Sequence, residues 1–153
     1  IYLPNGNPAP GPKYEYKLAW MERLKKRLAS LIEQNTTFII GGDFNVIPED
    51  IDCYDPKAWE QDALFRLETK KAYRSLLNLG LTDGFRIFNT SDKHYSFWDY
   101  QAGAWQKNNG IRIDHFLLSP LMADHVEKCV INKTPRGWEK PSDHTPIEIT
   151  LHS

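Results

Sequence analysis

The chain has 153 residues, of which 41% are hydrophobic, 12% aromatic and 25% charged, and its net charge is -1. This composition is typical of one ordered globular domain and excludes a disordered or fibrous protein. No apolar run approaches the roughly 20 residues that a membrane span needs, so we expect a soluble protein with no membrane partner. The charge shows no basic excess of the kind that usually accompanies phosphate binding, and local clusters such as Lys25-Lys26-Arg27 are more often solvated surface.

The two cysteines, Cys53 and Cys129, lie far apart in the sequence and belong to no CxxC or Cys/His spacing. The sequence therefore predicts neither a zinc site nor a disulfide framework. We expect both to be buried thiols in a reducing cytosol.

The first half of the chain begins with a short alternating apolar stretch, residues 1–3, followed by a Pro/Gly/Asn-rich loop over residues 4–12. We expect such a start to lie partway through a domain. Apolar residues at helical spacing predict a helix over residues 14–33. Residues 37–40 are β-branched and aromatic, which predicts a buried strand that ends in a tight turn at Gly41-Gly42 and leaves Asp43 at the strand's C-terminal end.

The second half begins with an aperiodic acidic stretch over residues 48–62. A helix is predicted for residues 69–79, with Gly80 as its cap. Short β-prone segments, separated by Gly, Asn and Pro, then predict a mostly sheet-forming remainder; they cover residues 95–100, 111–118, 126–131 and 147–151. Helices that flank packed strands in a single α/β layered domain are the simplest architecture for this order.

Polar and aromatic residues that can carry chemistry gather in five short islands, each at a predicted strand end or in a loop. These are Tyr2-Leu3-Pro4-Asn5-Gly6, Gly42-Asp43-Phe44-Asn45, Ser96-Phe97-Trp98-Asp99-Tyr100, Asn109-Gly110-Ile111-Arg112-Ile113-Asp114 and Pro141-Ser142-Asp143-His144. Taken singly, each has an ordinary structural interpretation: Asp43 and Asn45 as turn formers, Asp114 as an ion-pair partner, Phe97-Trp98 as core.

Together, the islands bring three acids, two asparagines and one histidine to the ends of strands that we expect to lie side by side. Carboxylate and amide oxygens are the ligands that Mg²⁺ prefers, whereas a single His without Cys or a second spaced His is a poor zinc site. The sequence therefore favours magnesium, with Mn²⁺ as a substitute, and a reaction in which a phosphodiester is attacked by an oriented water.

In this order the islands resemble those of exonuclease III and the abasic-site endonucleases of the endonuclease/exonuclease/phosphatase superfamily, over almost the whole chain. The most specific matches are Gly-Asp-Phe-Asn at 42–45 and Ser-Asp-His at 142–144. Tyr-Leu-Pro-Asn-Gly at 2–6 and Arg-Ile-Asp at 112–114 narrow the likeness to the abasic-site branch. The resemblance implies a Mg²⁺-dependent hydrolase of DNA repair that cleaves double-stranded DNA 5′ to abasic sites and also acts at 3′ ends.

The resemblance also implies roles for individual residues. Asp43 would orient or deprotonate the attacking water, Asn45 would hold that water and a phosphate oxygen, and His144 would polarise the phosphate. Asp114 would fix the tautomer of His144, as orienting carboxylates do in other histidine sites. The implied metal ligands are Asp43, Asn45, Asp143 and His144.

Substrate contacts follow from the same likeness. Tyr2 and Asn5 would touch the phosphate near the leaving group, and the apolar pocket for a base-less sugar would be formed by Phe97, Trp98, Ile111 and Ile113, with Arg112 in the same group. We expect this pocket to exclude an intact base by its size.

The chain lacks the N-terminal half in which the family carries an Asn and a Glu that bind the metal. The implied fold is therefore the C-terminal half of a four-layer α/β sandwich with a mostly antiparallel or mixed sheet, so that residues 1–153 form a partial domain whose missing half is a partner. Alone, we expect the chain to expose one sheet face and to be inactive.

Two other functions stay open. Phosphoinositide phosphatases and sphingomyelinases share the Gly-Asp-x-Asn and Ser-Asp-His islands and act on lipids or small phosphoesters. A non-catalytic fragment that only binds nucleic acid or another chain is the alternative of a different class.

Overall fold

The structure is a computed structural model that describes all 153 residues. Its helices and strands, in chain order, are α1 (Pro12–Glu33), β1 (Ile39–Asp43), η1 (Asp50–Asp52), α2 (Pro56–Trp59), α3 (Leu67–Leu77), β2 (Thr82–Asp83), α4 (Gly84–Phe88), α5 (Ala104–Lys107), β3 (Asp114–Leu118), α6 (Pro120–Ala123), β4 (Val126–Ile131), η2 (Thr134–Gly137) and β5 (Ile147–Leu151). The predicted α/β class with antiparallel strands is confirmed.

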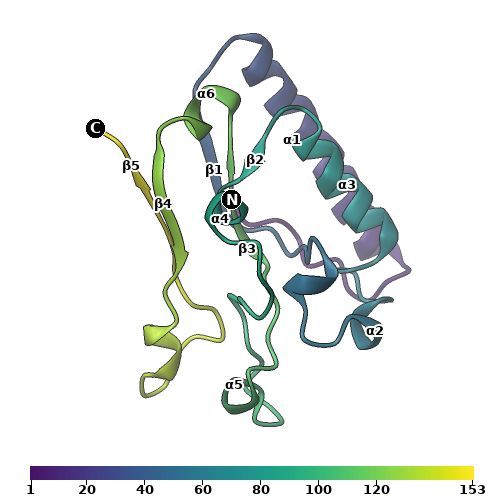
Figure 1. The fold of residues 1–153 in the computed structure, drawn as a ribbon. Helices are drawn as coiled ribbons and strands as arrows, with labels where there is room; N and C mark the ends of the chain where they lie inside the picture. The colour runs from purple at the N-terminus through teal and green to yellow at the C-terminus, as the bar shows by residue number, and fades with distance from the viewer.

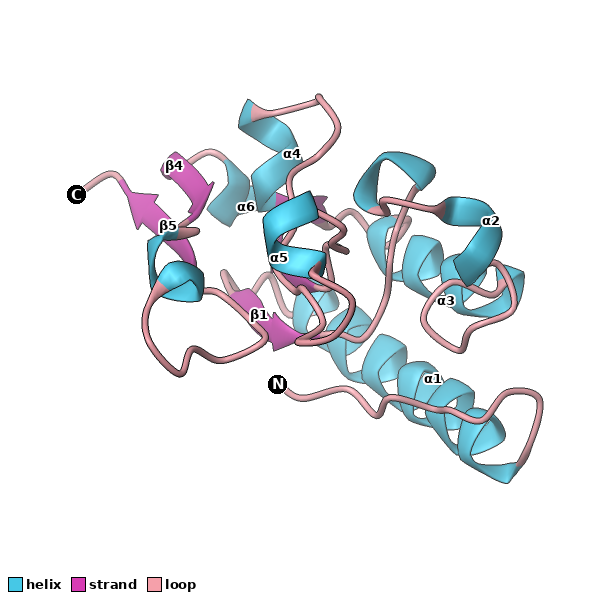
Figure 2. Cartoon of the chain, turned by 90° about the horizontal axis from the view of Figure 1, so that it is seen from below, coloured by secondary structure: helices cyan, strands magenta, loops and turns pink.

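A three-stranded sheet with the order β1-β3-β2 lies at the centre of the chain, and both of its pairings are antiparallel. Helices α1 and α3 lie side by side along one side of this sheet, and the antiparallel β4–β5 ribbon lies on the other side (Figure 1). The view from below again shows the β4–β5 ribbon and helices α1 and α3 on opposite sides of β1 (Figure 2). The largest buried cluster joins α1 and α3 to the sheet.

Helix α1 starts at Pro12, whose fixed φ suits the first turn of a helix. Met21 and Leu28 are fully buried, and Leu24 and Leu31 pack against the same cluster, so the apolar stripe predicted from the sequence faces the core. Helix α3 begins and ends two residues before the predicted bounds, and Gly80 caps it as expected: its φ is +110° and its N–H donates to the Leu77 carbonyl over 2.9 Å.

The predicted turn at Gly41-Gly42 is wrong, because β1 continues through both glycines to Asp43. The glycines permit close packing instead. A Cβ on Gly41 would lie 2.7 Å from the Phe116 ring, and a Cβ on Gly42 would lie 1.9 Å from the Ile1 carbonyl oxygen. Gly42 has a φ of +144°, and it lets the first residues of the chain run along the free edge of β1.

The prediction of a mostly sheet-forming second half is only partly right. Strands β3, β4 and β5 form where expected, but residues 95–100 make single bridges instead of a ladder. Phe97 pairs with Ile111 and with His144 in these bridges. The side chains of Tyr95 and Trp98 are buried together in a small separate cluster. Short helices α4, α5 and α6 occupy the intervening connections.

Both cysteines are buried and free, as predicted. Burial raises the pKa of each thiol to about 11, so both are inert as nucleophiles near neutral pH. No helix of the chain is long and apolar enough to cross a membrane.

Candidate active site

Three segments of the chain meet at one end of β1. The antiparallel register of β1 and β3 places Asp43 directly opposite Asp114. Tyr2 pairs with Asp43 in a parallel bridge on the other edge of β1, and the Leu3 N–H donates to the Asp43 carbonyl over 2.9 Å. Residues that are remote in the sequence therefore surround the Asp43 carboxylate.

Asn45 follows in a tight turn with a φ of +48°. Its backbone N–H donates to Asp43 Oδ1 over 2.9 Å, and its side-chain Nδ2 donates to the Leu3 carbonyl over 2.7 Å. The second bond fixes the plane of the amide, so the orientation of Asn45 Oδ1 is set by the N-terminal segment.

His144 bridges the two carboxylates. Its Nδ1 lies 2.8 Å from Asp114 Oδ2, and its Nε2 lies 3.6 Å from Asp43 Oδ2. The ring also meets Phe97 edge to face, with the centroids 5.2 Å apart. Asp114 can thus accept a hydrogen bond from Nδ1 of His144, and Nε2 faces Asp43.

The three groups shift one another's pKa values. Burial raises the pKa of Asp43, and the negative charge of Asp114 adds to this effect against the Asn45 N–H and His144, which lower it. Burial lowers the pKa of His144, but the hydrogen bond and charge of Asp114, together with Asp43 and Asp143, outweigh it and raise the pKa above the usual histidine value. Asp43 is therefore a stronger base than an exposed carboxylate, and His144 stays cationic to higher pH.

A cavity of about 290 Å³ opens onto these groups. Eight of the residues expected from the sequence line it: Tyr2, Asn5, Asp43, Asn45, Phe97, Ile111, Ile113 and His144. The structure adds four that the sequence did not predict, namely Asn7, Trp59, Asp62 and Leu64. We call this space the catalytic pocket.

The added polar residues are joined to one another. Asn7 Nδ2 donates to Asn5 Oδ1 over 2.9 Å and to Asp62 Oδ1 over 3.2 Å, and Asn7 Oδ1 accepts the Ala63 N–H over 3.1 Å. Asp62 lies in the aperiodic acidic stretch that the sequence left without a role, and no spacing in that stretch distinguishes it from its acidic neighbours.

Lys17 was also missed, and the sequence did carry a signal for it. Together with Met21, Leu24 and Leu28 it falls on the buried stripe of α1, and its side chain is fully buried. Its Nζ donates to the backbone carbonyls of Asn5, Asn45 and Ala63 over 3.0, 2.6 and 3.2 Å. Burial lowers the pKa of Lys17 to about 7, against the pull of Asp62 and Asp43.

The donor set fits a hard divalent cation only in part. Asp43, Asp114 and His144 each offer a ligand atom within 4.8 Å of the others. Two carboxylates and the nearby Asn45 amide are oxygen donors of the kind that Mg²⁺ takes, but Asp114 is already bonded to His144. Near-octahedral coordination would require further oxygen ligands.

Asp143 does not join this cluster. Its side chain is absent from the group of ligand atoms within 4.8 Å, and its backbone carbonyl accepts the Trp98 N–H over 3.0 Å. Its charge contributes to the raised pKa of His144.

The assignment of Trp98 to the substrate pocket is wrong. Its side chain is 0% exposed, its Nε1 donates to Asn108 Oδ1 over 3.0 Å, and its ring packs edge to face on Trp105 at 4.9 Å. Neighbouring residues of an extended segment point to opposite sides, so Phe97 faces the pocket and Trp98 faces the core.

The assignment of Arg112 as a substrate contact is also wrong. Its guanidinium is 1% exposed and lies between Asp52 and Asp83, with its Nε 2.6 Å from Asp52 Oδ1 and its Nη2 2.8 Å from Asp83 Oδ2. Its Nη1 also contacts His115 Nδ1 over 3.2 Å. Ile111 and Ile113, on either side, point to the pocket instead.

Comparisons with known proteins agree on one family. The sequence model of the protein family described as "Endonuclease/Exonuclease/phosphatase family" matches residues 2–144. The chain is 32% identical to a protein named exodeoxyribonuclease from Bacillus subtilis, covering 99% of the chain and 58% of that protein. It is 31% identical to DNA repair nuclease APEX1 from Danio rerio, covering 98% of the chain and 47% of the relative.

Solved structures give the same result. An AP endonuclease from Archaeoglobus fulgidus aligns with a TM-score of 0.93 and 34% identity over 99% of this chain and 59% of the other. The 3′ phosphatase NExo from Neisseria, bound to product DNA hairpin, aligns with a TM-score of 0.95 and 32% identity over 100% of this chain and 60% of the other. The chain therefore spans about half to three fifths of the length of these relatives.

Proposed function

The chain belongs to the Endonuclease/Exonuclease/phosphatase family, and from that premise we propose that it carries the hydrolytic centre of a divalent-metal-dependent DNA repair nuclease. The proposed substrates are double-stranded DNA with abasic sites, cleaved on their 5′ side, and DNA 3′ ends. The observation that supports this most directly is His144 held between Asp43 and Asp114 above a pocket lined by Phe97 and Ile111.

Each group has a task in breaking a phosphodiester bond. Asp43, whose pKa is raised, takes a proton from the attacking water, and Asn45 positions that water. Cationic His144 stabilises the charge that develops on a non-bridging oxygen, and Asp114 keeps its ring in the correct orientation. Tyr2 and Asn5 lie on the pocket wall where they can contact the phosphate near the leaving oxygen.

We propose Mg²⁺, with Mn²⁺ as a substitute, as the resident cation. Asp43 and Asn45 would hold it through oxygen atoms, and the ion would add positive charge beside the scissile phosphate. Asp143 would act on this site through its negative charge, which helps to raise the pKa of His144.

The remaining ligands would come from outside residues 1–153. The relatives are longer than this chain, and the oxygen donors here fall short of an octahedral shell. We propose that a segment N-terminal to Ile1 supplies them and packs on the chain to complete a four-layer α/β sandwich. The two buried free thiols accord with the cytoplasmic location expected from the sequence.

The proposal is tested by an incision assay on duplex DNA that carries one tetrahydrofuran abasic site. The assay is run with Mg²⁺ or EDTA, on this chain and on the chain joined to its N-terminal segment. We expect Mg²⁺-stimulated incision only in the joined protein, and losses of about 10²-fold or more in Asp43→Asn and His144→Ala, with DNA binding retained.

Asp114→Ala separates the working pair from independent residues. Because Asp114 acts through the imidazole, the double variant with His144→Ala should be little worse than His144→Ala alone. Activity near that of the parent protein in either Asp43→Asn or His144→Ala would contradict the proposed mechanism. Incision in the presence of EDTA would contradict the proposed requirement for a divalent metal.

A further inference from the structure

A second cavity, of about 200 Å³, adjoins the catalytic pocket and contains none of its acids or its histidine. The two spaces share the side chains of Trp59, Phe97 and Ile111. Tyr54 lines only the second cavity. A molecule bound at the catalytic groups can therefore extend past Phe97 and Ile111 without leaving the protein surface.

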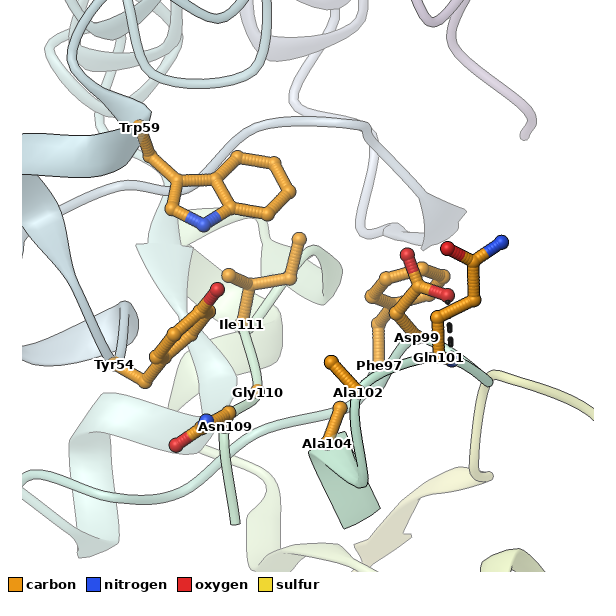
Figure 3. Close-up of a pocket in the computed structure, with 10 residues that line it drawn as sticks. All are labelled: Tyr54, Trp59, Phe97, Asp99, Gln101, Ala102, Ala104, Asn109, Gly110 and Ile111. Atoms are coloured by element: carbon orange, nitrogen blue, oxygen red, sulfur yellow. Dashed lines mark hydrogen bonds between the residues drawn. The ribbon is translucent and has the colours of Figure 1, made fainter. Parts of the chain in front are cut away.

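The walls of this second cavity are aromatic. Trp59 and Tyr54 stand on one side, Phe97 stands on the other, and Ile111 projects into the space between them (Figure 3). The floor is backbone at Gly110, where a Cβ would lie 2.7 Å from the Tyr95 ring. Aromatic side chains on two sides of an aliphatic and backbone floor suit a flat ring system.

The rim of the second cavity is polar. Asn109 and Gln101 offer side-chain amides, and the carboxylate of Asp99 accepts the Gln101 N–H over 3.0 Å. Amides and carboxylates pair with the hydrogen-bonding edges of nucleobases.

The size of the cavity limits its occupant. It is smaller than the roughly 300–1,000 Å³ of pockets for drug-sized ligands, so it takes one ring system and not a dinucleotide. Phe97 and Ile111 lie between the catalytic groups and the second cavity, so a nucleotide with its phosphate at Asp43 and His144 would have its sugar beside these two residues and its base next to the second cavity.

We propose that this second cavity receives the nucleobase of the nucleotide whose phosphate is cleaved, with Tyr54 and Trp59 stacking on it. The proposal rests on the proposed nuclease function and specifies it: the protein removes intact nucleotides from 3′ ends with the base bound, whereas at an abasic site this cavity stays unused. The second cavity is distinct from the catalytic pocket, which we still expect to exclude an intact base by its size.

Tyr54→Ala is the diagnostic change, because Tyr54 is 42% exposed and lies outside the catalytic pocket. Tyr54→Phe keeps the ring and should behave as the parent protein does. Trp138→Ala removes an aromatic side chain that is more accessible, at 64% exposed, and lies outside both cavities, and it serves as the control.

Two measurements are made on the chain joined to its N-terminal segment. The first compares kcat/KM for removal of an intact 3′-terminal nucleotide with kcat/KM for incision at an internal tetrahydrofuran. We expect Tyr54→Ala to lower the former about 10- to 100-fold, the range of one lost base–aromatic stack, and to leave the latter within about twofold.

The second measurement needs no turnover. A duplex with 2-aminopurine as its 3′-terminal base is bound in EDTA, and we expect its fluorescence to be quenched by the parent protein, Tyr54→Phe and Trp138→Ala, but less by Tyr54→Ala. Equal losses on both substrates, or quenching that Tyr54→Ala leaves unchanged, would overturn the base site. A parent protein that incises nothing but still shows Tyr54-dependent quenching would contradict the nuclease proposal and leave the base site standing.

Discussion

Trp98 and Phe97 are adjacent in sequence, and their replacement by alanine should have opposite consequences. Trp98 is fully buried, with edge-to-face contacts to Trp105 and Tyr95 and an indole N–H bonded to Asn108 Oδ1. Loss of a buried aromatic side chain costs about 3–5 kcal/mol, a large part of the roughly 5–15 kcal/mol that stabilises a domain. In a chain of this size that cost lowers Tm by roughly 6–20 °C.

The assay pairs thermal unfolding of each variant with its rate of incision at a tetrahydrofuran site. We expect Trp98→Ala to lower Tm by that amount while its folded fraction keeps the parent's substrate preference. Phe97→Ala, which removes a half-buried pocket wall, should leave more of the Tm intact and weaken the preference for abasic over intact nucleotides. The reasoning is refuted if Trp98→Ala leaves Tm unchanged and alters substrate choice.

Three further changes test the buried charges. Arg112→Met leaves Asp83 without its partner and should cost about 3–5 kcal/mol in urea unfolding; a loss below about 1 kcal/mol would argue against the ion pair. The NMR titration midpoint of His144 should lie above the usual value of about 6.5 and fall in Asp114→Asn; the stability from this pairing is present below that usual value and is lost as pH rises through the raised pKa. Because the pKa of Lys17 is lowered to about 7, the unfolded chain binds more protons there at higher pH, so stability should rise from about pH 7 to about pH 10, and Lys17→Met should flatten that rise.

The sequence predicted the elements whose residues follow a simple period. Helix α1 and the strands β4 and β5 formed where their apolar spacing placed them. Asp43, Asn45 and His144 could be selected because each belongs to a short island, and all three line the catalytic pocket. Local patterns were sufficient for these positions.

Other positions depended on which way a side chain faces. Nothing in Phe97-Trp98 says which ring is buried until the bridges of Phe97 to Ile111 and His144 are known. The resemblance placed Arg112 among the substrate contacts, and no local pattern showed that it is buried, because its two acidic partners lie 60 and 29 residues away in the sequence. Lys17 differs, because its place on the buried stripe of α1 could have identified it.

Gly42 carries a consequence for how variants of this protein are interpreted. The Ile1 carbonyl occupies the space of a Cβ at position 42, and Tyr2 is aligned with Asp43 only while that approach is kept. A side chain at position 42 would push residues 1–3 away from β1, and the Leu3 carbonyl that orients Asn45 would move with them. Gly42→Ala would therefore have the same effect as damage to both Tyr2, the proposed phosphate contact, and Asn45, the proposed water-positioning amide. Residue 42 itself would contact neither the phosphate nor the water.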